Sequence, residues 1–174
     1  MEAIIRAARE PVFPAKVGIV ISPTKEAQAL ERASELGVPT SVVAFGEDYP
    51  TRLETTLSSA DTTLVCLAGY MRLLPSEVLA QYPRRVLNIH PALLPKFGGK
   101  GMYGNHVHRA VIDAEEPESG CTVHFVTEAY DEGDIVLQKR VPVLRGDSPE
   151  TLATRVLQAE HETYPEAIRM VLNG

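Results

Sequence analysis

The chain alternates short, continuous apolar runs with segments whose apolar residues recur at helical spacing. The run within Lys16–Ser22 is apolar on both faces, which is typical of a parallel strand covered by helices on each side. The segment Glu26–Leu36 follows it, with apolar residues every three or four positions and Gly37 just after its end, as expected for a helix. This alternation predicts an α/β fold built from right-handed strand–helix–strand units.

The pattern changes in the second half of the chain. Two strand-like segments, 121–126 and 135–143, are joined by a short acidic turn, which predicts an antiparallel addition to the sheet. Asp147–Glu150 carries the start signals of a final helix. We expect a doubly wound, mostly parallel, Rossmann-like sheet with an antiparallel C-terminal part and a C-terminal helix. Further strands are expected at 40–44, 62–68 and 85–89, and further helices at 49–59, 75–82 and 106–114.

Composition limits the classes of function. A length of 174 residues fits one domain spanning 1–174. The net charge of -6 and the lack of a Lys/Arg run argue against binding nucleic acid or an anionic membrane. Cys66 and Cys121 lie in apolar runs, where thiols behave as buried apolar groups, so we expect a reducing, cytoplasmic location. The expected protein is a monomer or homodimer that acts on a small molecule.

Two polar residues close the strand expected at 85–89. An open α/β sheet binds its ligand beyond the carboxyl ends of its strands, and the spacing of Asn88 and His90 puts both on one face. An amide donor beside an imidazole can stabilise an oxyanion and transfer a proton. Asp131, in the acidic turn, would raise the pKa of His90 if it lay nearby. A capped strand followed by a surface turn is an equally good interpretation of these residues alone.

Several phrases of the sequence carry a family resemblance. Residues 88–97, NIHPALLPKF, resemble the signature of formyltransferases that use 10-formyltetrahydrofolate, and residues 67–74, LAGYMRLL, stand at the expected distance before it. Three later phrases, at 120–127, 131–138 and 160–165, resemble the phosphoribosylglycinamide formyltransferase branch, which serves de novo purine biosynthesis. The resemblance covers nearly the whole chain.

The resemblance implies transfer of the formyl group of 10-formyltetrahydrofolate to the amine of glycinamide ribonucleotide. Asn88 and His90 would polarise the formyl oxygen and manage proton transfer, with Asn88 also facing the substrate. Asp131 would raise the pKa of His90 and order a water, and Glu160 would hold the ribose hydroxyls. The residues implied to bind the folate are Met71, Arg72, Leu73, Leu74, Val126, Thr127 and Glu128, with Arg52 near its glutamate tail. For Glu160 and Arg52, a solvated position on a helix is the alternative.

The chain also departs from the family pattern. Family members open with a strand and a Gly-rich turn whose amides hold the substrate phosphate at a helix N-terminus, whereas Met1–Arg9 resembles the helix that follows that turn. We therefore expect the first strand of the family fold to be missing here and the native chain to extend upstream. The alternatives are an inactive or truncated folate-binding relative, or another transferase or hydrolase that uses 10-formyltetrahydrofolate.

Other polar features support weaker hypotheses. The glycine-rich loop Phe97–Asn105 lacks the Gly-Lys-Ser/Thr ending of a phosphate-binding P-loop, and a mobile lid is the alternative interpretation. His106 and His108 do not share a helix face, so we expect no metal. His124 either lines the pocket behind His90 or is a hydrogen-bonded core residue.

Overall fold

The computed structural model describes residues 1–174, and it contains every helix and strand expected from the sequence. Several strands are shorter than the apolar runs that predict them. Along the chain the elements are α1 (Glu2–Ala7), β1 (Val20–Ser22), α2 (Gln28–Glu35), β2 (Thr40–Val42), α3 (Tyr49–Ser59), β3 (Val65–Leu67), α4 (Ser76–Gln81), β4 (Val86–His90), α5 (Asn105–Asp113), β5 (Glu118–Phe125), β6 (Ile135–Pro142) and α6 (Pro149–Asn173).

The sheet topology is mixed. β1 pairs with β2, and β3 with β4, in parallel, whereas β5 pairs antiparallel with both β4 and β6. This confirms the α/β class and the antiparallel C-terminal part. The strands form two sheets, β1-β2 and β3-β4-β5-β6, because no strand lies between β1 and β3 to join them.

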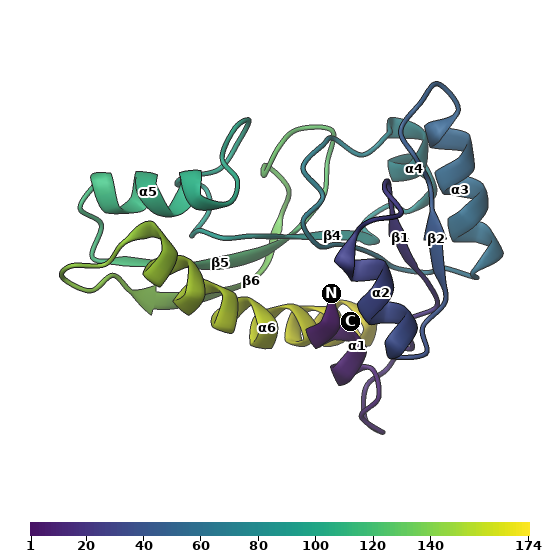
Figure 1. Cartoon of the computed structure of the whole chain (residues 1–174), viewed down its shortest axis with the longest axis horizontal. Helices are drawn as coiled ribbons and strands as arrows, with labels where there is room; N and C mark the ends of the chain where they lie inside the picture. The colour runs from purple at the N-terminus through teal and green to yellow at the C-terminus, as the bar shows by residue number, and fades with distance from the viewer.

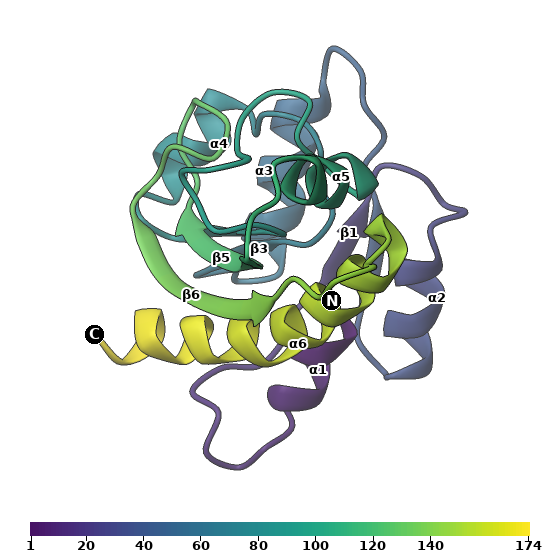
Figure 2. The ribbon, with the colours of Figure 1, turned by 90° about the vertical axis from the view of Figure 1, so that its left-hand side faces the viewer.

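Helices cover both faces of the larger sheet. α6 packs along β5 and β6 and also contacts α1 and α5, whereas α3 and α4 lie on the opposite side (Figures 1 and 2). Val86 and Leu87, neighbours on β4, point into different cores: Val86 packs with residues of α3 and α4, and Leu87 with residues of α6. Successive side chains of a strand alternate between faces in this way. No helix combines the length and the apolar character needed to span a membrane.

The start and the middle of α6 are both fixed by hydrogen bonds. Ser148 caps the helix, since its hydroxyl accepts the N–H of Thr151 while the Thr151 hydroxyl accepts the N–H of Ser148, which confirms the predicted start signal. Farther along, the buried hydroxyl of Tyr164 lies 2.9 Å from the carbonyl oxygens of both Leu67 and Leu87. The helix is thereby held against β3 and β4, the strands that lead to the candidate site.

Candidate active site

The end of β4 carries Asn88 and His90 on the same face as Val86, because side chains two apart on a strand point the same way. The segment after His90 is tied to β5. The Thr122 hydroxyl donates to the carbonyl oxygen of Ala92 at 2.6 Å and accepts the N–H of Leu94 at 3.1 Å. These buried bonds fix the backbone that follows His90 and so restrict where its imidazole can lie.

The His90 ring is buried and has a polar partner at each nitrogen. Its Nε2 lies 2.7 Å from the carbonyl oxygen of Phe97, so Nε2 carries a proton and donates it. Its Nδ1 lies 3.5 Å from Oδ2 of Asp131. Burial lowers the pKa of His90, while Asp131 and the Phe97 carbonyl act in the opposite direction. Asp131 therefore acts on the pKa of His90 in the expected direction, but desolvation outweighs it and the pKa is lowered overall.

Asp131 connects three parts of the site. Its backbone is left-handed, with φ of 58°, and its side chain is only 11% exposed. Oδ2 accepts the N–H of Gly99 at 2.9 Å, and Oδ1 lies 3.5 Å from Nε2 of His124. Burial alone would raise the pKa of Asp131, but the hydrogen bonds from His124 and Gly99 and the nearby His90 lower it. The side chain is therefore a carboxylate at neutral pH.

His124 joins Asn88 to this group. The Nδ2 of Asn88 lies 3.2 Å from Nε2 of His124, and Nδ1 of His124 lies 2.9 Å from the carbonyl oxygen of Phe125. Only a protonated Nδ1 can donate to that carbonyl, and Nε2 of the same ring faces both the Asn88 amide and Oδ1 of Asp131. The two interpretations of His124 thus hold together: it is a hydrogen-bonded, buried residue, and it lies within the site. We call Asn88, His90, His124 and Asp131 the His90 cluster.

Two main-chain groups of the site were not predicted from the sequence. The carbonyl of Phe97 and the N–H of Gly99 bind His90 and Asp131, so the first residues of the Gly-rich loop form one wall of the cluster. Gly99 has φ of 95°, a conformation that glycine adopts readily. The only signal for this role was the glycine content of the loop. The Gly99 N–H serves the carboxylate of Asp131, which speaks against the phosphate-loop interpretation.

The residues implied to bind folate lie in two segments near β3 and β5. Met71 and Leu73 are 65% and 43% exposed, respectively. The guanidinium of Arg72 lies 3.9 Å from the ring centroid of Phe45, a cation–π contact. Leu74 is buried in the core beneath α3 and α4, so of these four side chains it alone has no free surface to offer a ligand.

The second segment follows β5. The N–H of Val126 donates to the carbonyl oxygen of Val86 at 2.9 Å, which keeps the chain beside β4 at the start of the turn. Thr127 and Glu128 are exposed. This turn carries Asp131 back to the His90 cluster, so its exposed residues lie on a segment that is anchored at both ends.

Glu160 and Arg52 make no hydrogen bond or ion pair with the His90 cluster. Glu160 lies on α6, and burial raises its pKa to about 7, while the amino group of Met1 acts in the opposite direction. Arg52 lies on α3 with its guanidinium 4.0 Å from Asp48.

The His90 cluster offers an amide, two imidazoles and a carboxylate in one connected network. Such a set suits proton transfer and oxyanion stabilisation at a carbonyl.

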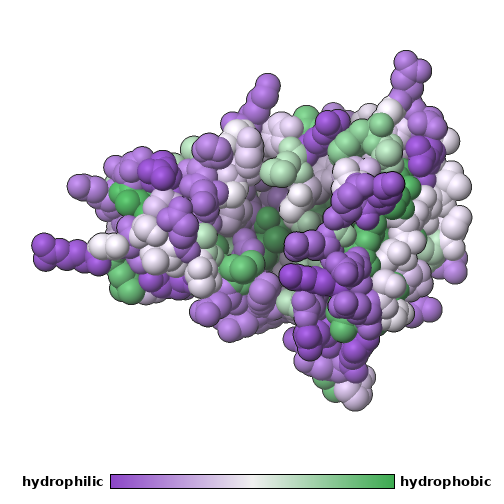
Figure 3. Space-filling model, viewed as in Figure 1, coloured by the Kyte–Doolittle hydropathy of each residue, from purple (hydrophilic) through white to green (hydrophobic).

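No group of three or more His, Cys, Asp or Glu side chains is arranged to hold a metal ion. The face of the molecule shown in Figure 3 is hollowed near its middle, between the side that carries α5 and the side that carries α2.

Comparisons with known proteins agree with this geometry. A family model described as "Formyl transferase" matches residues 1–168. The trifunctional purine biosynthetic protein adenosine-3 of Bos taurus is 40% identical over 100% of this chain, which spans only 17% of that protein. Phosphoribosylglycinamide formyltransferase of Escherichia coli (strain K12) is 37% identical over 100% of this chain and 82% of its own length.

A solved structure extends the likeness to three dimensions. Glycinamide ribonucleotide transformylase 1 from Symbiobacterium toebii superposes with a TM-score of 0.92 at 42% identity, covering 99% of this chain and 82% of that one. The family model, the identity across the whole chain and the shared fold point to the same group. This chain belongs to the formyl transferase family, among the phosphoribosylglycinamide formyltransferases.

Proposed function

We propose that the chain transfers the formyl group of 10-formyltetrahydrofolate to the amine of glycinamide ribonucleotide, a step of purine biosynthesis. The observation that supports this most directly is the His90 cluster at the end of β4, in which His90 contacts Asp131 directly and Asn88 is linked to Asp131 through His124. Two of these residues come from β4 and two from β5 and its following turn, so the network depends on the fold.

The reaction breaks the bond between the formyl carbon and N10 of the folate and forms a bond from that carbon to the substrate nitrogen. The amine attacks the formyl carbon, and negative charge develops on the formyl oxygen. The Asn88 amide donates a hydrogen bond to that oxygen, where donors contribute most. The attacking nitrogen loses a proton and N10 gains one, and His90 carries the proton between them.

Asp131 stabilises His90 while it holds that proton. A carboxylate 3.5 Å from Nδ1 favours the imidazolium that forms during the transfer. The carbonyl of Phe97 at Nε2 fixes the orientation of the ring, in the way that backbone acceptors fix catalytic imidazoles. His90 is thus neutral at rest, because it is buried, and is stabilised by Asp131 when it becomes charged.

The donor and acceptor would lie on either side of the cluster. For the folate we propose Met71, Arg72 and Leu73 on one edge and Val126, Thr127 and Glu128 on the other, with Arg52 near the glutamate tail. Leu74 would support this edge from the core. Glu160 would accept hydrogen bonds from the ribose hydroxyls. We further propose that residues 1–174 act as one domain, as a monomer or homodimer in the cytoplasm, where the free thiols of Cys66 and Cys121 stay reduced.

A thermal-shift experiment tests the two binding sites separately. A non-reactive analogue of 10-formyltetrahydrofolate and glycinamide ribonucleotide are each titrated alone, since a ligand raises the melting temperature only through a site that exists in the folded chain. The proposal predicts a saturable shift with each ligand. A shift with the folate analogue alone would instead indicate a folate-binding protein that does not take up the ribonucleotide.

A further inference from the structure

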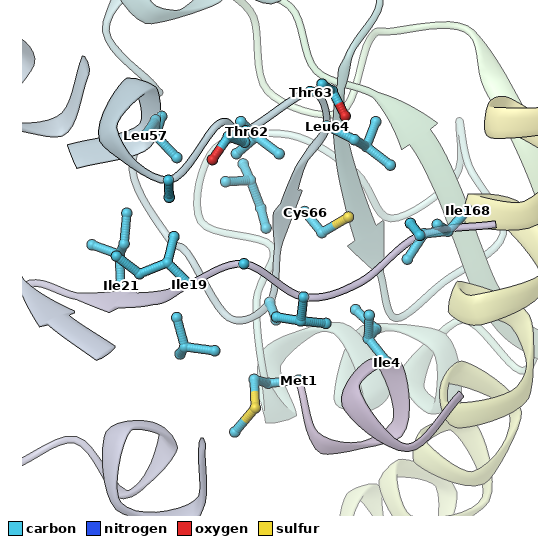
Figure 4. Close-up of a pocket in the computed structure, with 18 of the residues that line it drawn as sticks. Met1, Ile4, Ile19, Ile21, Leu57, Thr62, Thr63, Leu64, Cys66 and Ile168 are labelled. Atoms are coloured by element: carbon cyan, nitrogen blue, oxygen red, sulfur yellow. The ribbon is translucent and has the colours of Figure 1, made fainter. Parts of the chain in front are cut away.

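Two cavities of the molecule differ sharply in the chemistry of their walls. One, of about 470 Å³, separates β1 from β3 and is lined mainly by apolar side chains, among them Ile19, Ile21 and Leu64 (Figure 4). The other, of about 320 Å³, has a wall in which polar and charged residues predominate. We call the second cavity the polar pocket. None of the four residues of the His90 cluster lines it.

The polar pocket borders the segment that positions His90. Residues 93–97 form one of its walls, and Phe97 is the residue whose carbonyl oxygen binds Nε2 of His90. Val111 of α5 and residues of β5 and β6 form the rest of the wall. The pocket therefore shares a backbone segment with the candidate active site but contains none of its side chains.

Gln138 gives the pocket a hydrogen-bond acceptor without a partner. Its Nε2 donates to the carbonyl oxygen of Leu94 and to the hydroxyl of Thr122, each at 2.9 Å. Both N–H groups of the amide are used in these bonds, which fixes the orientation of the amide. No hydrogen bond within the protein reaches Oε1 of Gln138, so this atom can accept from an occupant.

Ser119 contributes a second polar group without a partner. It lines the pocket, is only 2% exposed, and its hydroxyl forms no hydrogen bond. A buried hydroxyl without a partner costs free energy, because it has lost its bonds to water. A polar occupant of the pocket would recover that loss.

Four charged side chains of both signs also line the pocket. Nζ of Lys96 lies 2.7 Å from Oε1 of Glu116, and Arg140 forms an ion pair with Glu118. Both cationic side chains are 65% exposed. Ion pairs that are so exposed contribute little to stability, so these side chains can take a new partner at small cost.

The balance of charge selects the kind of occupant. The wall carries two cations and two carboxylates, so a ligand with a net charge would meet as many like charges as opposite ones. A zwitterion instead offers a carboxylate to the cations and an ammonium group to the carboxylates, which is electrostatic complementarity at both of its ends.

The volume limits the size of the occupant. Small-molecule sites span about 300–1,000 Å³, and 320 Å³ lies at the lower end of that range. A free amino acid is a zwitterion of suitable size. A side-chain amide, with both donors and an acceptor, matches the free Oε1 of Gln138 and the hydroxyl of Ser119, and the methylene carbons can contact Leu93 and Val111.

We propose that the polar pocket binds a free, zwitterionic α-amino acid with an amide side chain. The charged ends of this ligand pair with the four ion-pairing side chains of the wall, and its amide bonds to Gln138 and Ser119. The site is distinct from the proposed catalytic cluster, and its occupation does not depend on formyl transfer.

Isothermal titration calorimetry of the full chain with L-glutamine tests the proposal. We expect saturable binding at one site with a Kd of about 1 mM or tighter. L-Glutamine amide, which lacks the carboxylate, and N-acetyl-L-glutamine, which lacks the ammonium group, should each bind at least about tenfold more weakly. No saturable binding of L-glutamine, or equal binding of the two analogues, would overturn the proposal.

Variants locate the binding site. Glu116→Gln and Ser119→Ala each remove a group of the wall and should weaken binding of L-glutamine, by about fivefold or more. Glu115→Gln is the matched control, since Glu115 is exposed and lies outside the pocket. His90→Ala should bind L-glutamine as the parent does, and the melting transition confirms that each variant is folded. Binding that is lost in His90→Ala but kept in Glu116→Gln and Ser119→Ala would place L-glutamine in the candidate active site and contradict the assignment.

Discussion

Asp131 Oδ2 lies 3.5 Å from His90 Nδ1 and at the same time accepts the N–H of Gly99 at 2.9 Å. The carboxylate is thus shared between the imidazole and the loop that covers it. Because the Phe97 carbonyl holds the other nitrogen of His90, the Gly-rich loop fixes both members of the pair. Loop position and the charge of His90 are coupled through these contacts.

Asn88 is expected to act on the formyl oxygen. Asn88→Ala removes the amide donor, and we predict a fall in the turnover number of about 100- to 1000-fold, the usual effect of losing one oxyanion donor. Asn105→Ala is a matched control, since Asn105 is exposed and its amide donates a hydrogen bond to Glu150, away from the His90 cluster. Steady-state kinetics of both variants are the measurement. A loss confined to KM would show that Asn88 only binds substrate.

Gly133 should be required for the position of the Asp131 turn. A Cβ at Gly133 would overlap the carbonyl oxygen of Phe125, the group that accepts from His124. Gly133→Ala must therefore move the turn, and we predict a destabilisation of about 1–3 kcal/mol together with a loss of most activity. Gly46→Ala is the control, because its nearest neighbour would be 3.5 Å away. Urea unfolding and activity assays of both variants check this, and an unaffected Gly133→Ala variant would contradict the geometry.

Much of the fold could be predicted because its local signals are strong. Continuous apolar runs marked the strands, and the Ser148 cap marked the start of α6 within one residue. The split into two sheets could not be predicted from these signals alone, because strand pairing depends on which neighbours are present rather than on the sequence of one strand.

The side chains of the candidate site could be predicted from the sequence, but its main-chain groups could not. Asn88, His90 and Asp131 follow from strand ends and from the family resemblance. The roles of the Phe97 carbonyl and the Gly99 amide do not, since main-chain groups carry no residue-specific signal. The overall lowering of the His90 pKa was not predicted either, because burial depends on packing around the ring.

Glu160 should make stability depend on pH. Its pKa is raised from 4.5 to about 7 by burial, so the folded state binds its proton more tightly than the unfolded state does. The stability that the protonated Glu160 carboxyl contributes is fully present below about pH 4.5 and is lost as the pH rises through about 7. Glu160→Gln removes this effect, so the variant should gain up to ~3 kcal/mol relative to the parent between pH 4.5 and pH 8.

Urea unfolding of the parent and of Glu160→Gln, at pH 4.5 and at pH 8, measures the difference in their free energies of unfolding. Glu166→Gln, an exposed change on the same helix, should show no such trend. If the difference between Glu160→Gln and the parent stays constant with pH, the carboxyl is not desolvated as the structure indicates.

Tyr164 is expected to stabilise the fold without acting in catalysis. Tyr164→Phe removes the hydroxyl that contacts the carbonyl oxygens of Leu67 and Leu87 and should cost about 1–2 kcal/mol. Tyr103→Phe, at a side chain 49% exposed, should be neutral. Denaturant unfolding midpoints of the two variants are the measurement. An unchanged midpoint for Tyr164→Phe would mean that these contacts make no net contribution to the free energy of unfolding.

The most direct test of the account is formyl transfer from 10-formyltetrahydrofolate to glycinamide ribonucleotide by the parent chain and by the variants His90→Ala and Asp131→Asn. We predict measurable transfer by the parent, loss of about 100-fold or more for His90→Ala, and a loss for Asp131→Asn that resides in the turnover number rather than in KM. Folding of each variant is confirmed by its melting transition. Transfer by His90→Ala at the parent rate would contradict the central claim that His90, charged with the help of Asp131, carries the proton.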